Sequence, residues 1–188
     1  LKKSGAKESV QLGDHGRGFA LFADAAHQMD MDQIPGKHKF IRGNHDDPAA
    51  CKADPRYIED GYFDEDRSIM HIGGALSIDK EWRTPGLSYW EDEELSYTEL
   101  GDMINKYEAV KPDIMLTHEC PEPIVGQLFD WYSKQRWPTR TRNAFGTMFE
   151  IHKPKLWVFG HWHHTTKKNI LGTEFVCLNE LDTMEITV

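Results

Sequence analysis

The chain has 188 residues, which is enough for one domain with a substantial buried core. Its 22 lysines and arginines against 31 aspartates and glutamates give a formal net charge of −9, which argues against a protein that coats nucleic acid. No apolar run approaches the roughly 20 residues of a membrane span, no secretory signal is evident, and three widely spaced cysteines are typical of a reduced chain. We expect a single domain over residues 1–188, located in the cytoplasm and without a membrane partner.

The first part of the chain predicts strands that alternate with helices. Residues 8–12 predict a strand, and apolar residues at helical spacing predict a helix over 19–31. A short strand is expected over 37–42. The acidic pair before Pro48 is typical of a helix start, with a cap residue and a proline in the first turn.

The middle of the chain predicts a hairpin, a loop and a long helix. Residues 68–72 and 75–78 predict two strands around a Gly-Gly pair. The segment 81–94 is rich in tryptophan, proline and acidic residues, which favours a long loop. An amphipathic helix is expected over 97–110, followed by a strand over 113–116.

The last part of the chain predicts two helices and then consecutive strands. Helices are expected over 124–131 and 141–152, and strands over 156–159, 174–178 and 184–188. Strands that first alternate with helices and later follow one another suit an α/β fold in which two packed sheets lie between helices.

Four short polar motifs directly follow expected strands. They are Gly13-Asp14, Gly43-Asn44-His45-Asp46, Thr117-His118-Glu119 and Gly160-His161-Trp162-His163. Ligands of α/β proteins bind beyond the carboxyl ends of strands. Oxygen and imidazole donors at such positions are what a metal-dependent hydrolase needs.

The order of these motifs resembles that of the calcineurin-like metallophosphoesterases, over about residues 14–163. The family order is Asp-x-His, Gly-Asp, Gly-Asn-His-Asp/Glu, a lone His, and Gly-His-x-His. Four of these blocks are present, and the first is absent from residues 1–12. The resemblance implies a β-sandwich flanked by α-helices. Because residues 1–6 look like a helix end before the strand 8–12, we expect that the first strand of this fold is lacking.

The resemblance also implies a ligand set. Asp14 would bridge two metal ions, Asn44, His118 and His161 would bind the second ion, and His163 would bind the first. Imidazole ligands suit Mn, Fe, Zn or Ni better than Mg or Ca, and Mn is the metal that we expect. Each motif alone also has an ordinary interpretation, as a turn or a packed or exposed histidine.

Counting donors separates the two metal positions. The second metal keeps a full protein set, whereas the first keeps only Asp14 and His163, fewer than the three protein ligands of a typical fixed site. We therefore expect one firmly bound ion and one weak or empty position. His15, Asp46 or a neighbouring chain could complete the weaker one.

The same resemblance assigns the catalytic groups. His45 would protonate the leaving oxygen after attack by a metal-activated hydroxide, and Asp46 could hold its imidazole in one tautomer. Arg17 and Arg42 lie beside metal motifs and are candidate phosphate ligands, because a guanidinium can bind phosphate through two hydrogen bonds. Further candidates from loops are Arg83, Arg140 and Arg142.

The expected activity is hydrolysis of phosphate esters. The sequence around Arg42 favours a phosphomonoesterase that acts on a phosphoprotein, a nucleotide or another phosphorylated small molecule. The alternatives are a phosphodiesterase that uses the same site, and a non-catalytic metal-binding scaffold for protein interactions. An exposed sheet edge could also pair two chains into a homo-oligomer.

Overall fold

The computed structural model describes residues 5–19, 35–129 and 139–187. Within these ranges the chain forms two β-sheets, four α-helices and one short 3₁₀ helix. The strands are β1 Glu8–Leu12, β2 Lys37–Ile41, β3 Tyr62–Asp64, β4 Ile69–Ile72, β5 Ile114–Thr117, β6 Leu156–Phe159, β7 Thr166–Ile170 and β8 Thr173–Cys177. The helices are α2 Pro48–Lys52, η2 Lys80–Trp82, α3 Tyr97–Val110, α4 Glu122–Leu128 and α5 Arg140–Ile151.

The two sheets differ in size, and both contain parallel strands. Strands β1 and β2 pair in parallel as a two-stranded sheet. The larger sheet has the order β3-β4-β5-β6-β8-β7, with four parallel strands in the middle and antiparallel strands at both edges. Central parallel strands are buried on both faces, which explains the unbroken apolar runs of β5 and β6.

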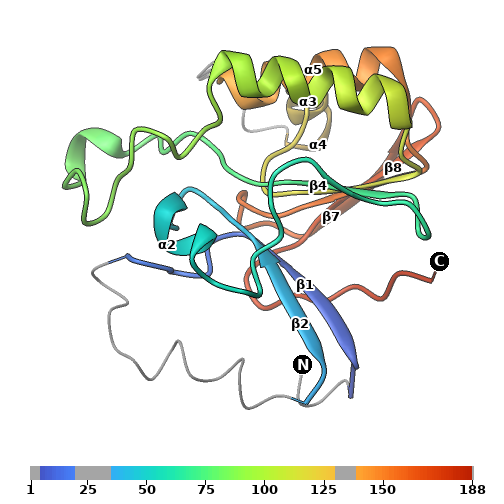
Figure 1. Ribbon diagram of the computed structural model, residues 1–188. Coiled ribbons are helices and arrows are strands. Elements are labelled where there is room, and N and C mark those ends of the chain that lie inside the picture. Colours follow the sequence, from blue (N-terminus) through green and yellow to red (C-terminus); the bar gives the residue numbers. More distant parts are fainter. Residues whose placement is uncertain (1–4, 20–34, 130–138, 188) are drawn as a thin grey trace.

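The larger sheet lies between two layers (Figure 1). Helices α3, α4 and α5 cover one face, and the core there includes Tyr107, Phe145 and Trp157. The other face carries Val158 and its neighbours, against which Val10 and Leu12 of β1 pack. The predicted α/β fold of packed sheets flanked by helices is confirmed.

Local sequence signals account for the helix starts. Ser96 and Glu99 form a capping box at the start of α3, where each side chain accepts the other residue's backbone N–H. Asp47 caps α2 by accepting a hydrogen bond from the N–H of Ala49.

Most predicted elements are present with small shifts of their ends. The ranges 8–12, 97–110 and 156–159 agree residue for residue with β1, α3 and β6. The predicted helix over 19–31 lies, from residue 20 onward, outside the described residues, and so does the end of the helix predicted over 124–131.

Two predicted strands are wrong. Residues 75–78 form no strand, because the chain turns at Gly74 (φ 80°) and its N–H bonds to the carbonyl of Arg42 instead of a hairpin partner. Strand β4 instead forms an antiparallel pair with β3, which precedes it in the chain. Residues 184–187 pack Met184 and Ile186 against the sheet without joining its hydrogen bonds. Apolar alternation predicted burial there but could not show whether a strand partner was available.

Strands β3 and β7 were missed because their sequences lack an apolar pattern. Strand β7 is an edge strand whose Lys167, Lys168 and Asn169 are exposed. Lysines on an edge strand discourage pairing with another chain. Strand β7 forms because its backbone pairs with β8, and its side chains carry no apolar pattern that would predict it.

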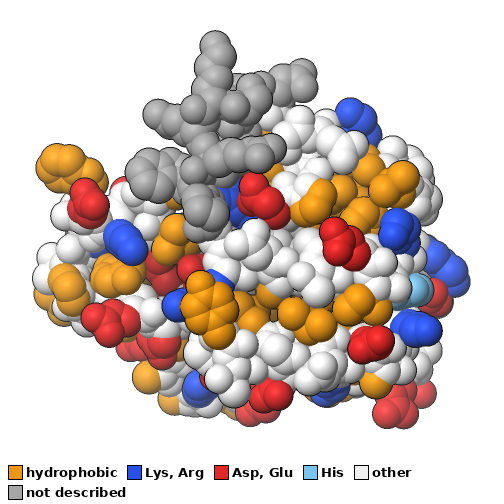
Figure 2. All heavy atoms as spheres, turned by 90° about the horizontal axis from the view of Figure 1, so that it is seen from above, with side chains coloured by type: hydrophobic (Ala, Val, Ile, Leu, Met, Phe, Trp, Pro, Cys, Tyr) orange, Lys and Arg blue, Asp and Glu red, His pale blue; other side chains and the backbone are white. Residues whose placement is uncertain are grey.

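The helix-covered face of the molecule carries mixed charge. Among its described side chains, acidic and basic groups are scattered between hydrophobic ones (Figure 2). A nucleic-acid-binding face gathers its lysines and arginines instead. None of the helices in the described ranges is long and apolar enough to cross a membrane.

Candidate metal centre

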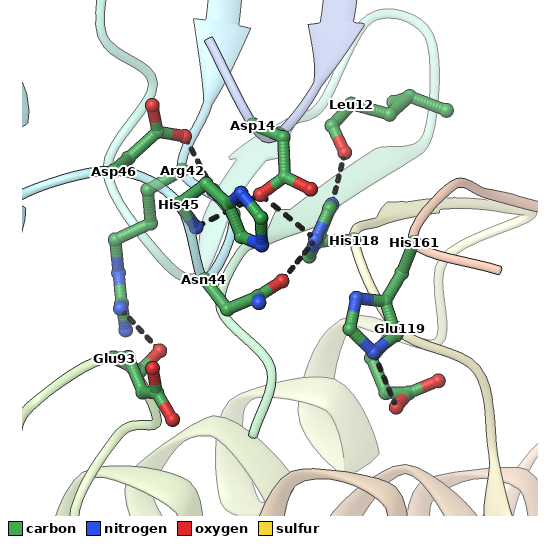
Figure 3. A network of polar contacts seen from close by, with 12 residues as sticks. Leu12, Asp14, Arg42, Asn44, His45, Asp46, Glu93, His118, Glu119 and His161 are labelled. Carbon is green, nitrogen blue, oxygen red and sulfur yellow. Dashed lines mark hydrogen bonds and ion pairs between the residues drawn. The ribbon is translucent and has the colours of Figure 1, made fainter. Parts of the chain in front are cut away.

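Four predicted ligands meet where the two sheets bring their carboxyl strand ends together (Figure 3). Asp14 follows β1, Asn44 follows β2, His118 follows β5 and His161 follows β6. One ligand atom each of Asp14, His118 and His161 lies within 4.8 Å of the other two. Residues from 14 to 161 thus converge on one point.

The hydrogen bonds of His118 show what this point can bind. Its Nδ1 lies 2.6 Å from the carbonyl oxygen of Leu12, which can only accept, so Nδ1 carries the proton. In the neutral ring Nε2 then presents a lone pair. It faces Asn44 Oδ1 at 3.0 Å and Asp14 Oδ1 at 3.3 Å, which are also acceptors. Three electron-rich atoms directed at one another fit a cation between them.

Two of the predicted ligands have backbone conformations that residues other than glycine rarely adopt. Asp14 has φ 57° and His161 has φ 66°, both in the left-handed region. Such strain is concentrated at functional sites, where the surrounding structure maintains it. Asp14 is held by the backbone N–H of His45, 2.9 Å from its Oδ1. Gly43 makes room, since a Cβ there would collide with the Asp14 carboxylate.

The electrostatics of the cluster favour the ligand forms of its residues. Burial raises the pKa of Asp14, but His118, His45 and His161 outweigh this effect and hold that pKa below its usual value. Burial lowers the pKa of His161 to about 3, with a further lowering by His118. A carboxylate and neutral imidazoles are the forms that bind metal ions.

A buried relay orients the amide of Asn44. Its Nδ2 donates to Ser77 Oγ at 3.0 Å, and that hydroxyl donates to Glu93 Oε2 at 2.6 Å. This pairing turns the Asn44 carbonyl toward His118. Sequence reasoning missed Ser77 and Glu93, because nothing in a loop of mixed composition distinguishes a serine that contacts a ligand.

Glu119 supports the cluster from the other side. Its Oε1 accepts hydrogen bonds from Trp162 Nε1 at 2.7 Å and from the N–H of Cys120 at 2.8 Å. Its Oε2 lies 3.7 Å from His161 Nε2. Burial raises the pKa of Glu119, and the guanidinium of Arg142 opposes this effect. Glu119 is therefore a buried carboxylate that lies behind His161, a predicted ligand.

His45 lies beside the cluster but faces a partner that the motif did not indicate. Its Nε2 is 2.6 Å from Arg83 Nη2, and its ring stacks on Phe19 with centroids 5.2 Å apart. Burial lowers the pKa of His45, the carboxylate of Asp14 raises it, and Arg83 lowers it further. The predicted general acid is therefore positioned by Asp14, Phe19 and Arg83.

The predicted partner of His45 is engaged elsewhere. The Asp46 carboxylate accepts backbone N–H groups of His15, Arg17 and Gly43, at 3.1, 2.9 and 2.7 Å. Among the described contacts, none joins Asp46 to the His45 ring. Asp46 ties the loop after β1 to the loop after β2, which explains its burial.

The two predicted phosphate ligands also have other partners. The guanidinium of Arg17 contacts Asp54. Arg42 is buried, with Nε 2.7 Å from Asp60 Oδ2 and Nη1 2.7 Å from the carbonyl oxygen of Glu93. Neither contact directs a guanidinium at the metal cluster, so a substrate role for them stays a prediction.

His163 is not brought to the cluster. Its side chain is more than half exposed, and Nδ1 lies 2.7 Å from Glu180 Oε1. Trp162 between the two histidines is anchored by Glu119 and stacks on Phe129, so His161 faces inward while His163 faces outward. The predicted set for the second metal is assembled, and a role of His163 at the first metal stays a prediction. His15 packs on Phe40, with ring centroids 4.8 Å apart.

A comparison with protein-family models identifies the class of this chain. The family model described as calcineurin-like phosphoesterase matches residues 9–165, most of the chain. The chain belongs to that family, and the resemblance inferred from its motifs is confirmed. No curated protein matches the sequence.

Proposed function

We propose that this chain hydrolyses phosphate monoesters, such as those of nucleotides or phosphoproteins, with a divalent transition metal. The observation that carries the proposal is the convergence of Asp14, Asn44 and His118 on one point beside His45. The set of oxygen and imidazole donors suits Mn²⁺. Its protein ligands would be Asp14, Asn44, His118 and His161.

A cation held there supplies Lewis acidity to the phosphoryl oxygens and lowers the pKa of water toward neutrality. The protein's own task is to keep four donors at fixed positions before substrate arrives. The Leu12 carbonyl orients His118, and Ser77 orients Asn44. Preorganised groups need no rearrangement during the reaction, which is the main source of electrostatic catalysis.

His45 supplies the proton for the leaving oxygen. Stacking on Phe19 fixes the plane of its ring, so that Nε2 points along one direction. That atom is the proton-donating position when the ring is charged. Arg83 beside it places positive charge on the leaving-group side. A monoester carries more negative charge than a diester, which favours the monoester as substrate.

The test is Mn²⁺-dependent hydrolysis of p-nitrophenyl phosphate and of bis-p-nitrophenyl phosphate. We expect higher kcat/KM for the monoester, and a loss of about 100-fold or more in Asn44→Ala, because a ligand and its orienting network disappear. Asn169→Ala, an exposed residue of β7, is the matched control and should retain full activity. Preference for the diester would make the chain a phosphodiesterase instead.

A non-catalytic scaffold remains a distinct candidate because His163 lies outside the cluster. It predicts that Mn²⁺ binds, as measured by calorimetry, while neither ester is hydrolysed. Turnover that is abolished in Asn44→Ala would exclude it.

A further inference from the structure

The segment between Ser77 and Glu93 projects from the body of the molecule and is pinned at its base (Figure 1). Glu93 accepts the N–H of Ser77 at 2.6 Å as well as its hydroxyl. Arg42 donates to the carbonyl oxygens of Asp92 and Glu93. Since Ser77 also binds the amide of Asn44, the base of this loop is fixed to a metal ligand.

One side chain of this loop returns to the site. Arg83 Nη2 lies 2.6 Å from His45 Nε2 and 2.8 Å from Asp79 Oδ1. The Arg83 side chain is only 10% exposed although the loop around it is largely exposed. Its guanidinium carbon lies 5.8 Å from the centroid of Phe19, the same ring on which His45 stacks.

The direction of this contact follows from hydrogen-bond chemistry. A guanidinium only donates, so His45 Nε2 accepts from Arg83. Nε2 is also the atom that faces the leaving oxygen in the proposed reaction. Arg83 therefore occupies the space that the leaving group would enter.

The surroundings of Arg83 make it available to an incoming anion. Asp79 is half exposed, and ion pairs at such exposure contribute little stability. The carboxylate partners of Arg17 and Arg42, Asp54 and Asp60, are more buried than Asp79, the partner of Arg83. Among the described contacts, Arg83 is the arginine whose guanidinium is directed at His45.

We propose that Arg83 is a specificity-determining residue that binds an anionic group on the leaving part of the substrate. This inference rests on the proposed function and deepens it. The substrate class is a phosphate monoester whose alcohol carries a carboxylate or a second phosphate near the ester oxygen. Phe19 and Trp90, with centroids 6.0 Å apart, give this side of the site an aromatic wall. Binding of the anion draws Arg83 away from Nε2, and that atom, once it has taken up a proton from solvent, donates it to the leaving oxygen.

The experiment compares phenyl phosphate with 3-carboxyphenyl phosphate, two substrates that differ by one anionic group. The measured quantity is the ratio of their kcat/KM values with Mn²⁺. We expect the parent to prefer the carboxylated ester and the ratio to fall about tenfold or more in Arg83→Gln, the range of a charge-assisted hydrogen bond. Arg83→Lys should retain part of the preference, because it keeps the charge but loses the planar fork.

Lys80→Gln is the matched control, since Lys80 lies in the same loop and is exposed. It removes an equal charge and should leave the ratio unchanged. An unchanged ratio in Arg83→Gln would overturn the proposal. So would an equal loss on both esters, which would mean that Arg83 acts only through His45.

A binding measurement separates this proposal from the proposed function. Phenylphosphonate and 3-carboxyphenylphosphonate, which cannot be hydrolysed, are titrated calorimetrically onto the Mn²⁺-loaded protein. Tighter binding of the carboxylated compound that disappears in Arg83→Gln supports the proposal even if neither ester turns over. Equal affinity of the parent for both compounds contradicts it, whether or not the protein is a phosphatase.

Discussion

At the scale of the residue, the positions of the predicted ligands depend on side chains outside the predicted ligand set. His161 lies between the other two members of the cluster, Asp14 and His118, and the buried carboxylate of Glu119. A carboxylate behind a ligating histidine fixes its ring and raises its basicity, and loss of such a group typically weakens metal affinity by about 10- to 100-fold. Glu119 is itself held by Trp162 and Cys120.

We therefore expect Glu119→Gln to weaken Mn²⁺ binding by about tenfold or more, because the amide keeps the size of the side chain but not its charge. Isothermal titration calorimetry measures this directly. Glu122→Gln is the matched control: Glu122 Oε2 lies 3.2 Å from the same Arg142, and no described contact joins it to His161. Equal affinities of the two variants would show that the Glu119 carboxylate does not support the site.

At the scale of the element, short strands end at the site and longer helices stabilise the far side of the sheet. Helix α3 packs Tyr107 into the core and ends at Val110, and Lys111 after it caps the last turn with a φ of 45°. Its start depends on Ser96 and Glu99. The amphipathic pattern predicted this helix, and the capping box is a further local signal that fixes its first residue.

Ser96→Ala should lower the free energy of unfolding by about 1 kcal/mol, the usual effect of losing an N-cap side chain. Thr98→Ala, an exposed change in the same first turn, serves as the control and should shift it little. Urea denaturation followed by circular dichroism gives both values. Mn²⁺ affinity should not change, because α3 contributes none of the four ligands at the site.

At the scale of the whole molecule, buried histidines couple folding to pH. His71 of β4 is buried, with Nδ1 3.4 Å from the carbonyl oxygen of Tyr62. Burial lowers its pKa to about 4 from 6.5, and the Tyr62 contact only partly offsets this shift. The folded protein thus holds His71 neutral where the unfolded chain would protonate it.

A depressed histidine pKa stabilises the fold above pH 6.5, and this contribution is lost as the pH falls from 6.5 to 4. The loss attributable to His71 is on the order of 3 kcal/mol. His71→Gln should therefore show a flatter dependence of unfolding free energy on pH in this window. Urea titrations with a chelator present, so that metal ligands contribute equally to each protein, make the comparison. His164→Gln, at an exposed histidine, is the control. If the unfolding free energy of His71→Gln falls toward acid as steeply as that of the control, burial of His71 does not cause the pH dependence.

The sequence alone determined the features that depend on neighbouring residues. Apolar runs followed by Gly-Asp or Gly-Asn-His predict strands with ligands at their ends, because period and turn chemistry are local. The order of these motifs identified the family, and β1, α3 and β6 were predicted at their observed bounds. Four of the five residues predicted as ligands lie close together in the fold, and their metal binding stays a prediction.

Only the tertiary structure decided which groups surround those ligands. Arg83 is 38 residues from His45 and contacts it, whereas Asp46 is adjacent to it and is engaged with backbone N–H groups instead. His161 faces inward and His163 outward because Trp162 between them is anchored by Glu119. Each of these outcomes depends on contacts between distant segments, and no local pattern encodes the packing that creates them.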